Sequence, residues 1–399
     1  MYAYNGIKNK DENNCFINSL LQSFAHLAPV REFLLSKTYK HKCNSPCLPC
    51  EITTVLVGIL YSSSSISSTS IRAALVHVSN SSTFFYQERA CVIEAYEFIL
   101  KYYHSLHIED IILSLTDTMI EKNKNKVDVM EDDIQIVENK NYTNEYDICI
   151  EENKDYVNVK EKDIFIEENK NKVDVSEGYD DKDTKNKKNN DEIGVNEEDC
   201  GGNCFGHQNF GFITKMMGRS CCSGEYCQDN ILSSLNVCGE NFVKHFKAFG
   251  EESGLENVLS SVVEAESSNS FYKKCTCGEK YLVKRFISTF PKILTISILW
   301  NDPNLKNSHI FLPIINSQIN LSKILPCTES NSNCIYHFKG FIFFSRFFKH
   351  YMSVFFDESK MEWTYFSDSK TISSKHWKLV VTGLKIFQVT PAMLFYERG

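Results

Sequence analysis

Two residues far apart in the sequence, Cys15 and His350, have the chemistry of a thiol hydrolase. A cysteine becomes an effective nucleophile where its thiolate is stabilised, and a helix N-terminus with a neighbouring imidazole does this. Apolar residues with helical spacing follow the cysteine: Phe16, Leu20, Leu21, Phe24 and Leu27. This spacing predicts a helix that begins near Cys15. We therefore take Cys15 as the candidate nucleophile.

The segments around both residues resemble the two catalytic boxes of ubiquitin-specific proteases. GIKNKDENNCFINSLLQ, from Gly6 to Gln22, is similar to the Cys box of this family. HYMSVFFDESKMEWTYFSDSKT, from His350 to Thr371, is similar to its His box. The resemblance implies that Cys15 is the nucleophile and that His350 is the general base. Such a pair meets in space rather than along the chain.

The His box departs from the family pattern at two places. Lys349 precedes His350 where the family has glycine. Ser367 stands at the position of the carboxylate or amide that orients the imidazole in the family, and Asp368 follows it. The resemblance therefore leaves the orienting role open between Ser367 and Asp368.

The Cys box is altered as well. Asn9 lies six residues before Cys15 instead of the usual five, and Asp11–Glu12 stand where the box usually turns at a glycine. Two hydrogen-bond donors must converge on the oxyanion that forms during thiol hydrolysis. We expect these donors to be the Cys15 backbone N–H and the side-chain amide of Asn13 or Asn14.

These departures resemble an atypical branch of the family that includes the plant proteins called ubiquitin carboxyl-terminal hydrolase-related. Glu94–Phe98 (EAYEF) is similar to the family's Asp-Ala-x-Glu-Phe helix. Phe290–Trp300 (FPKILTISILW) is similar to its Pro-x-x-Leu-x-Ile-x-Leu strand. Together the resemblance covers about residues 5–108 and 200–397.

The order of predicted elements indicates an α+β fold. Helical patterns occupy the first part of the chain, over Cys15–Leu35, Arg72–Val78 and Ala90–Tyr103. Strand patterns dominate the last part, over Phe286–Trp300, Ile310–Ile315, Tyr336–Phe344, Met352–Phe356 and Trp363–Phe366. A helical half followed by a strand-rich half implies α+β, with the active site between the halves. The resemblance implies the papain-like cysteine protease superfamily, with a thumb at about 5–108 and palm and fingers at about 200–399.

Residues 117–198 interrupt this domain with a low-complexity segment. Residues 121–200 hold 25 acidic and 13 basic side chains, and KNKVDV occurs at both Lys124–Val129 and Lys170–Val175. A segment so polar buries too little apolar surface to offset the entropy of ordering it. We expect a solvated acidic insertion that is disordered or weakly ordered.

Two sets of cysteines and histidines have spacings that zinc ligands use. The first set falls where the resemblance places the zinc-bearing fingers, with Cys222 or Cys221 beside Cys227, facing Cys275 and Cys277. Two short-spaced pairs brought together by the fold would make a structural zinc site.

The second set joins two segments on either side of the insertion. Cys47 and Cys50 form a Cys-x-x-Cys pair, and Cys204 and His207 form a Cys-x-x-His pair. Cys43 could replace one of these ligands. The resembling branch carries the same two elements, which implies a shared zinc site.

Composition excludes several other classes of protein. Residues 121–200 carry a net charge of −12, so the remainder of the chain, with 26 acidic and 30 basic side chains, is only slightly positive, and no Lys/Arg stripe interleaved with aromatic residues indicates nucleic-acid binding. The first residues lack the pattern of a signal peptide, and no long apolar run indicates a membrane span. We expect a cytoplasmic or nuclear protein whose 16 cysteines are reduced or bind metal.

The sequence therefore predicts a cysteine-type deubiquitinase that cleaves the isopeptide or peptide bond at the C-terminus of ubiquitin. Its expected partners are ubiquitin, polyubiquitin chains and ubiquitinated proteins. Catalysis would need no cofactor, and zinc would be structural. One alternative is a catalytically weak or inactive ubiquitin-binding scaffold of the same fold. Another is a zinc-binding structural or interaction module.

Overall fold

The computed structural model describes residues 2–9, 13–36, 47–62, 66–79, 82–85, 90–107, 203–222, 224–268, 272–301, 308–328 and 334–399. All of them belong to one of the two units into which the chain divides, Met1–Asp117 with Val195–Gly399. The other unit is Thr118–Gly194. The acidic insertion at 117–198 lies outside the described residues, as do Asp11–Glu12 and Cys43.

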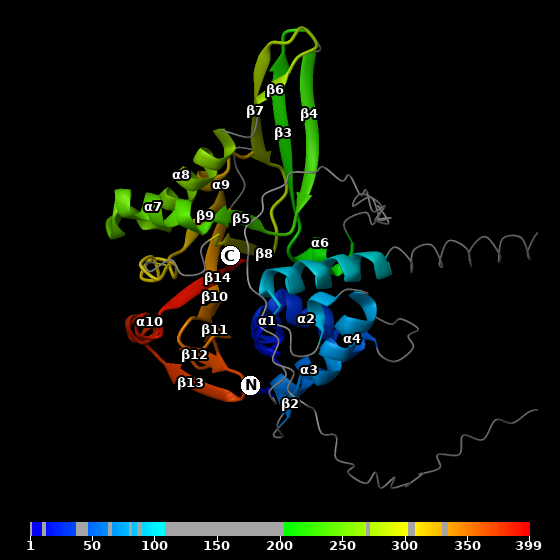
Figure 1. Cartoon of the computed structure of the whole chain (residues 1–399), viewed down its shortest axis with the longest axis vertical. Coiled ribbons are helices and arrows are strands. Elements are labelled where there is room, and N and C mark those ends of the chain that lie inside the picture. Colours follow the sequence, from blue (N-terminus) through cyan, green and yellow to red (C-terminus); the bar gives the residue numbers. More distant parts are fainter. Residues whose placement is uncertain are drawn as a thin grey trace, which may run out of the picture. The chain divides into compact units, whose positions relative to one another are not determined.

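The N-terminal part of the chain is helical (Figure 1). Its helices are α1 (Cys15–His26), α2 (Ala28–Leu35), α3 (Leu48–Tyr61), α4 (Thr69–Ser79) and a helix over residues 92–107. A short 3₁₀ turn, η1 (Ser82–Phe84), follows α4. The strands β1 (Ile7–Lys8) and β2 (Ile66–Ser67) pair in parallel beside these helices. We call this group of helices the thumb helices.

The helix predicted over Cys15–Leu35 is divided in two at Leu27. Leu27 has an extended backbone conformation, with ψ of 107°, and α2 begins directly after it. Pro29 explains the break, because proline has no N–H and its ring clashes with the preceding turn of a continuous helix. The Arg31 guanidinium donates a hydrogen bond to the Ala25 carbonyl at 2.9 Å. This contact occupies a carbonyl that a continuous helix would have paired with residue 29.

A large sheet forms the second part of the structure, in the order β13-β12-β11-β10-β14-β8-β5, with β9 beside β10. Neighbouring strands are antiparallel except β5 and β8, which are parallel. The bounds are β5 (Leu235–Cys238), β8 (Ile293–Leu299), β9 (Ile319–Asn320), β10 (Ile335–Ser345), β11 (His350–Asp357), β12 (Glu362–Ser367), β13 (Lys370–Ser374) and β14 (Val389–Arg398).

Hydrophobic side chains cover both faces of this sheet. Along β10, Ile342 belongs to the core around the thumb helices, while Phe341 and Phe343 belong to a second core. This is the period of two that a strand imposes on its side chains. The second core packs beneath α7 (Gly239–Phe249), α8 (Gly254–Ser268), α9 (Leu321–Ile324) and α10 (Trp377–Ile386). A short turn, η2 (Glu251–Ser253), joins α7 to α8.

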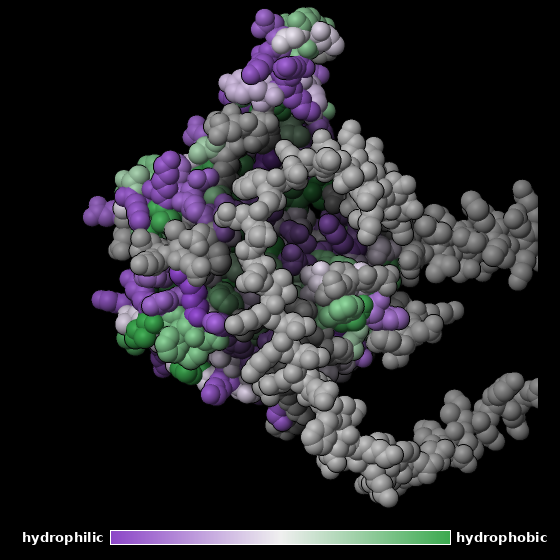
Figure 2. All heavy atoms as spheres, viewed as in Figure 1, coloured by the Kyte–Doolittle hydropathy of each residue, from purple (hydrophilic) through white to green (hydrophobic). Residues whose placement is uncertain are grey.

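A separate sheet extends away from these cores, in the order β4-β3-β7-β6 (Figure 1). Its strands are β3 (Phe212–Ser220), β4 (Gly224–Leu232), β6 (Tyr272–Lys274) and β7 (Lys280–Ile287). Figure 2 shows mainly hydrophilic residues along it, with a small hydrophobic group at the tip, where the turns between strands carry cysteines. We call it the finger sheet.

The predicted α+β class is confirmed, and the strands predicted over Tyr336–Phe344, Met352–Phe356 and Trp363–Phe366 lie within β10, β11 and β12. The strand predicted over Ile310–Ile315 is wrong, because this segment forms buried turns with hydrogen bonds between residues three apart. Pro313 cannot donate to a strand ladder. Within the part of the chain that the structure describes, no helix is both long and apolar enough to cross a bilayer.

Candidate active site

Cys15 is the first residue of α1, a helix that is buried along almost its whole length. Asn14 is the N-cap residue, and Asn13 has a φ of +52°, so the chain turns sharply into the helix. α1 packs against β11, which begins at His350. This packing brings Cys15 to His350, although 335 residues separate them in the sequence.

The imidazole of His350 lies between the Cys15 thiol and the Asp368 carboxylate. Its Nε2 is 3.1 Å from Asp368 Oδ2, and the Cys15 thiol is its second hydrogen-bond partner. Since Nε2 faces Asp368, Nδ1 is the nitrogen left for the thiol. Burial alone would lower the pKa of His350, but the contacts with Asp368 and Cys15 outweigh burial and raise it to about 9. These contacts therefore favour the charged imidazole, the form that the ring takes once it has accepted a proton from the Cys15 thiol.

Asp368 is held by backbone contacts as well as by His350. It occupies the first position of the two-residue turn between β12 and β13, with a φ of +51°, which aspartate tolerates better than most residues. Its carbonyl accepts a hydrogen bond from the Ile7 N–H at 3.0 Å. A Cβ at Gly6 would lie 2.6 Å from the same oxygen. Glycine is therefore required where the Cys box begins, so that β1 can approach this turn.

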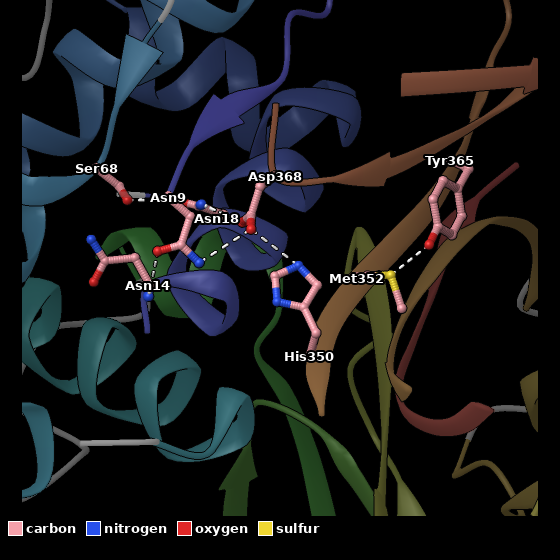
Figure 3. A network of polar contacts seen from close by, with 8 residues as sticks. All are labelled: Asn9, Asn14, Asn18, Ser68, His350, Met352, Tyr365 and Asp368. Carbon is pink, nitrogen blue, oxygen red and sulfur yellow. Dashed lines mark hydrogen bonds and ion pairs between the residues drawn. The ribbon is translucent and has the colours of Figure 1, made fainter. Parts of the chain in front are cut away.

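Three side chains surround the Asp368 carboxylate and donate to it (Figure 3). Besides His350, Asn9 Nδ2 donates to Oδ2 at 3.1 Å and Asn18 Nδ2 donates to Oδ1 at 2.7 Å. The amide of Asn18 is itself fixed, because the Ser68 hydroxyl donates to its Oδ1 at 2.5 Å. An ionised carboxylate can only accept, and here every partner is a donor.

Asp368, and not Ser367, is the residue that the structure brings to His350. Ser367 ends β12, and its hydroxyl is a hydrogen-bond partner of the Tyr365 phenol two residues earlier, on the same face of the strand. Figure 3 shows the Tyr365 hydroxyl directed at Met352, away from Asp368. The end of β12 thus decides between the two alternatives that the sequence left open, because Ser367 belongs to the strand and Asp368 to the turn that follows it.

Sequence reasoning did not assign Asn18 or Ser68. A signal was present for Asn18, because it follows Cys15 by three residues and side chains three apart lie on the same face of a helix. Ser68 lies between β2 and α4 and is fully buried. No local pattern points to it, since its contact with Asn18 joins residues 50 positions apart.

A buried arginine holds the two candidate oxyanion residues. Arg72 Nη1 donates to the Asn13 carbonyl at 3.3 Å and to Asn14 Oδ1 at 3.4 Å, and its Nε donates to the Phe84 carbonyl at 2.6 Å. Asn14 is only 1% exposed, and its side chain points away from His350 in Figure 3. Asn14 is therefore poorly placed to meet a substrate oxygen. The oxyanion role of Asn13 stays a prediction.

The turn before His350 explains one departure from the family pattern. Lys349 has a φ of +50°, in the left-handed region where glycine carries no steric penalty. A residue with a Cβ in this conformation costs roughly 1–2 kcal/mol. Ser345 pairs with His350 across the β10–β11 hairpin, and its hydroxyl accepts from the Phe348 N–H at 3.3 Å. These contacts close the turn around the strained lysine.

Four cysteines gather at the tip of the finger sheet: Cys221, Cys222, Cys275 and Cys277. Their sulfurs lie within 4.8 Å of one another, with Cys221 3.0 Å from Cys277 and 3.6 Å from Cys222. Tetrahedral zinc with Zn–S bonds of about 2.3 Å places sulfurs about 3.8 Å apart. Small side-chain adjustments would therefore let this cluster hold zinc.

The predicted ligand Cys227 does not belong to this cluster. It lies within β4, paired with Met217 and three residues beyond Gly224, where the strand begins. A strand advances about 3.3 Å per residue, so Cys227 stands roughly 10 Å from the tip. Cys221 takes its place, because the β3–β4 turn keeps Cys221 and Cys222 together at the tip.

The second predicted metal set is also revised. Among the described residues, Cys204 and His207 form a group with His104, and not with Cys47 and Cys50. Cys47 is the buried N-cap residue of α3, and Cys50 is exposed in the first turn of that helix. Sequence reasoning missed His104, because no cysteine lies at ligand spacing beside it in the sequence.

Comparison with known proteins identifies a family for this chain and a human relative. The family model described as "Ubiquitin carboxyl-terminal hydrolase" matches residues 5–396. The human protein "Ubiquitin carboxyl-terminal hydrolase 53" is 24% identical over 152 residues. This match covers 35% of the present chain and only 13% of the human protein.

Solved structures with the same fold include deubiquitinase modules. The "SAGA DUB module" Ubp8/Sgf11/Sus1/Sgf73 bound to ubiquitin aldehyde has a TM-score of 0.54 and 12% identity, over 98% of this chain and 69% of that chain. A variant of this module bound to monoubiquitin has a TM-score of 0.56 and 11% identity, over 98% and 68%. The chain thus has the papain-like fold of ubiquitin-specific proteases, and it belongs to the ubiquitin carboxyl-terminal hydrolase family of deubiquitinating cysteine proteases.

Proposed function

We propose that this chain is an active thiol-dependent deubiquitinase that cleaves the bond after the C-terminal glycine of ubiquitin. The observation that carries the proposal is the line of contacts from Asp368 through His350 to Cys15. The family supports ubiquitin as substrate, and two structural neighbours hold ubiquitin or ubiquitin aldehyde. Polyubiquitin chains and ubiquitinated proteins of the cytoplasm or nucleus are the proposed targets.

Cys15 and His350 carry out the proposed reaction in two steps. The Cys15 thiol gives its proton to Nδ1 of His350, and the sulfur attacks the carbonyl carbon of the terminal glycine. The imidazolium then returns the proton to the leaving amine, and a thioester remains. His350 next takes a proton from a water molecule, which hydrolyses the thioester and releases ubiquitin. Side chains of the protein supply every proton transfer, so no cofactor takes part.

Asp368 orients the imidazole and stabilises its charged form. Its Oδ2 receives the hydrogen bond from Nε2 and so turns Nδ1 toward Cys15. Asn9 and Asn18 act as positioning residues, because they hold the carboxylate and not the reacting atoms. Both belong to the N-terminal part, whereas Asp368 and His350 belong to the large sheet. The network therefore forms only when the thumb helices and the sheet are packed together.

The proposed oxyanion donors lie where α1 begins. The first N–H groups of a helix have no partner within the helix, and the Cys15 N–H is among them. We place this N–H at the oxyanion, with the Asn13 side chain as the second donor. The finger cysteines are proposed to bind a structural zinc ion, since their four sulfurs already stand near tetrahedral separations.

A catalytically weak ubiquitin-binding scaffold of the same fold is the second candidate function. Lys349 favours it, because a strained lysine replaces glycine directly before the base. Cleavage of diubiquitin separates the candidates. The enzyme should release monoubiquitin, Cys15→Ser should not, and Cys238→Ser, a half-buried cysteine in the sheet, serves as the matched control. Ubiquitin binding without cleavage would support the scaffold. A protein that neither cleaves diubiquitin nor binds ubiquitin would instead be a zinc-binding structural module.

A further inference from the structure

We propose that His104, Cys204 and His207 bind a zinc ion, in a site independent of the finger cysteines and of the active site. Their ligand atoms lie within 4.8 Å of one another. One thiolate and two imidazoles are ligands that zinc prefers. Zn–N bonds of about 2.0–2.1 Å and a Zn–S bond of about 2.3 Å place such atoms roughly 3.3–3.6 Å apart. The observed group therefore needs only a small contraction around the ion.

Local backbone structure directs Cys204 and His207 to the same side of their segment. Cys204 is the N-cap residue of α6 (Phe205–Asn209), and its sulfur accepts from the His207 N–H at 3.5 Å. Residues three apart at the start of a helix face the same way. The His104 ring, from the helix over residues 92–107, lies 5.0 Å from the His207 ring with an interplanar angle of 74°. Edge contact of this kind leaves nitrogen atoms of both rings near the Cys204 sulfur.

Apolar packing fixes the two helices relative to each other before any metal binds. The Phe205 ring lies 4.7 Å from the Tyr103 ring and 5.2 Å from the Phe33 ring. Gly206 lies beside Leu100, where an added Cβ would meet Leu100 Cβ at 3.5 Å, an ordinary van der Waals contact. Each metal ligand is adjacent to one of these packed residues in the sequence or one residue away. The donor atoms are therefore held in place, which lowers the entropic cost of binding a metal.

Burial gives a reason for a metal in this place. Cys204 is 2% exposed and His104 is 9% exposed, beside the aromatic residues of the thumb core. A hydrophobic shell of this kind limits the access of water to a bound metal ion. His104 and Cys204 also flank residues 108–202 in the sequence. Zinc would tie together the points where the chain leaves the thumb and returns to it.

Zinc content of the purified full-length chain tests the proposal. Mass spectrometry should find one zinc ion fewer per chain in His104→Gln and in Cys204→Ser than in the wild type, after exchange against a weak chelator. Cys334→Ser is the matched control, because Cys334 is equally buried and outside both groups. Cys275→Ser should remove a different zinc ion, so its combination with Cys204→Ser should lose two. The zinc lost in Cys204→Ser is thus measured independently of the zinc that the finger cysteines bind.

Cobalt(II) provides a second readout for the same site. In the Cys275→Ser background, cobalt should give a thiolate-to-metal absorption band that disappears with Cys204→Ser and weakens with His207→Gln. If Cys204→Ser does not fold, His104→Gln decides, since it keeps a polar side chain of similar size. Wild-type zinc content in a folded His104→Gln protein would overturn the proposal. It would show that the three residues only pack against one another.

Discussion

Replacing Asp368 by asparagine keeps the shape of the side chain and changes what it can accept. The carboxylate receives hydrogen bonds from Asn9, Asn18 and His350. Asparagine has one acceptor oxygen and one NH₂ group, which only donates. In one orientation the NH₂ faces the amide of Asn18, and in the other it faces Asn9 and His350. At least one donor therefore loses its partner in either orientation.

The expected loss follows from the charge that Asp368 places beside His350. Asp368 is the largest of the contributions that raise the pKa of His350 from 6.5 to about 9. A hydrogen bond to a charged group contributes about 1.5–3 kcal/mol, and each 1.36 kcal/mol changes a rate tenfold. Asp368→Asn should therefore lower kcat/KM roughly 10- to 100-fold, and the pKa of His350 should fall toward 6.5.

Hydrolysis of a fluorogenic ubiquitin conjugate from pH 6 to 10 measures both effects. Ser367→Ala is the control, and it should stay within about twofold of the wild type, because Ser367 contacts Tyr365. Melting temperatures show whether each variant is folded. Wild-type kcat/KM in a folded Asp368→Asn protein would refute the role of the carboxylate. An equal loss of kcat/KM in Ser367→Ala would show that Ser367, and not Asp368, orients His350.

Four other perturbations test separate parts of the structure. His350→Ala should abolish hydrolysis in a protein that still folds, with a melting temperature close to that of Asp368→Asn because both variants lose the same ion pair, and residual turnover near the wild-type value would exclude His350 as the base. Gly6→Ala should reduce kcat/KM at least tenfold, because its Cβ would lie 2.6 Å from the Asp368 carbonyl oxygen; an unchanged rate would show that the turn moves freely. Deleting residues 121–195 should leave cleavage of ubiquitin measurable, whereas unfolding would mean that the acidic insertion belongs to the fold. The raised pKa of His350 stabilises the folded state fully below about pH 6.5, and this stabilisation is lost as the pH rises through about 9. The melting temperature of the wild type should therefore approach that of Asp368→Asn as the pH rises through this range. A difference between the two melting temperatures that does not change with pH would contradict the ion pair between His350 and Asp368.

The sequence predicted those parts of the fold whose signals are local. Strands β10, β11 and β12 were recognisable because β-branched and aromatic residues are concentrated between turn residues. The helix after Cys15 was recognisable because its apolar residues recur with helical spacing. The Cys and His boxes were recognisable because each is a short motif of side chains that act together.

Other elements escaped sequence reasoning for physical reasons. α3 (Leu48–Tyr61) is apolar over most of its surface, so it shows little periodicity to separate a helix from a buried strand. The segment Ile310–Ile315 is apolar because it fills the second core, and burial alone does not distinguish a turn from a strand. α7 and α8 lie in a region that sequence reasoning left without any element.

The candidate site could be located from the sequence but not completed. Whether Ser367 or Asp368 meets His350 depends on where β12 ends, and element ends are the least reliable part of any sequence-based reading. Asn18 and Ser68 belong to the site through hydrogen bonds between segments that are far apart in the sequence. His104 joins Cys204 only because two helices pack against each other. Each of these needs tertiary structure.

The central claim is that the sulfur of Cys15 is the atom that attacks the C-terminus of ubiquitin. Ubiquitin propargylamide reacts with such a sulfur, and mass spectrometry of the digested adduct identifies the modified residue. We predict one adduct, on the peptide that contains Cys15, which is absent in Cys15→Ser and strongly slowed in His350→Ala. An adduct on another cysteine, or ubiquitin binding without any adduct, would contradict the claim.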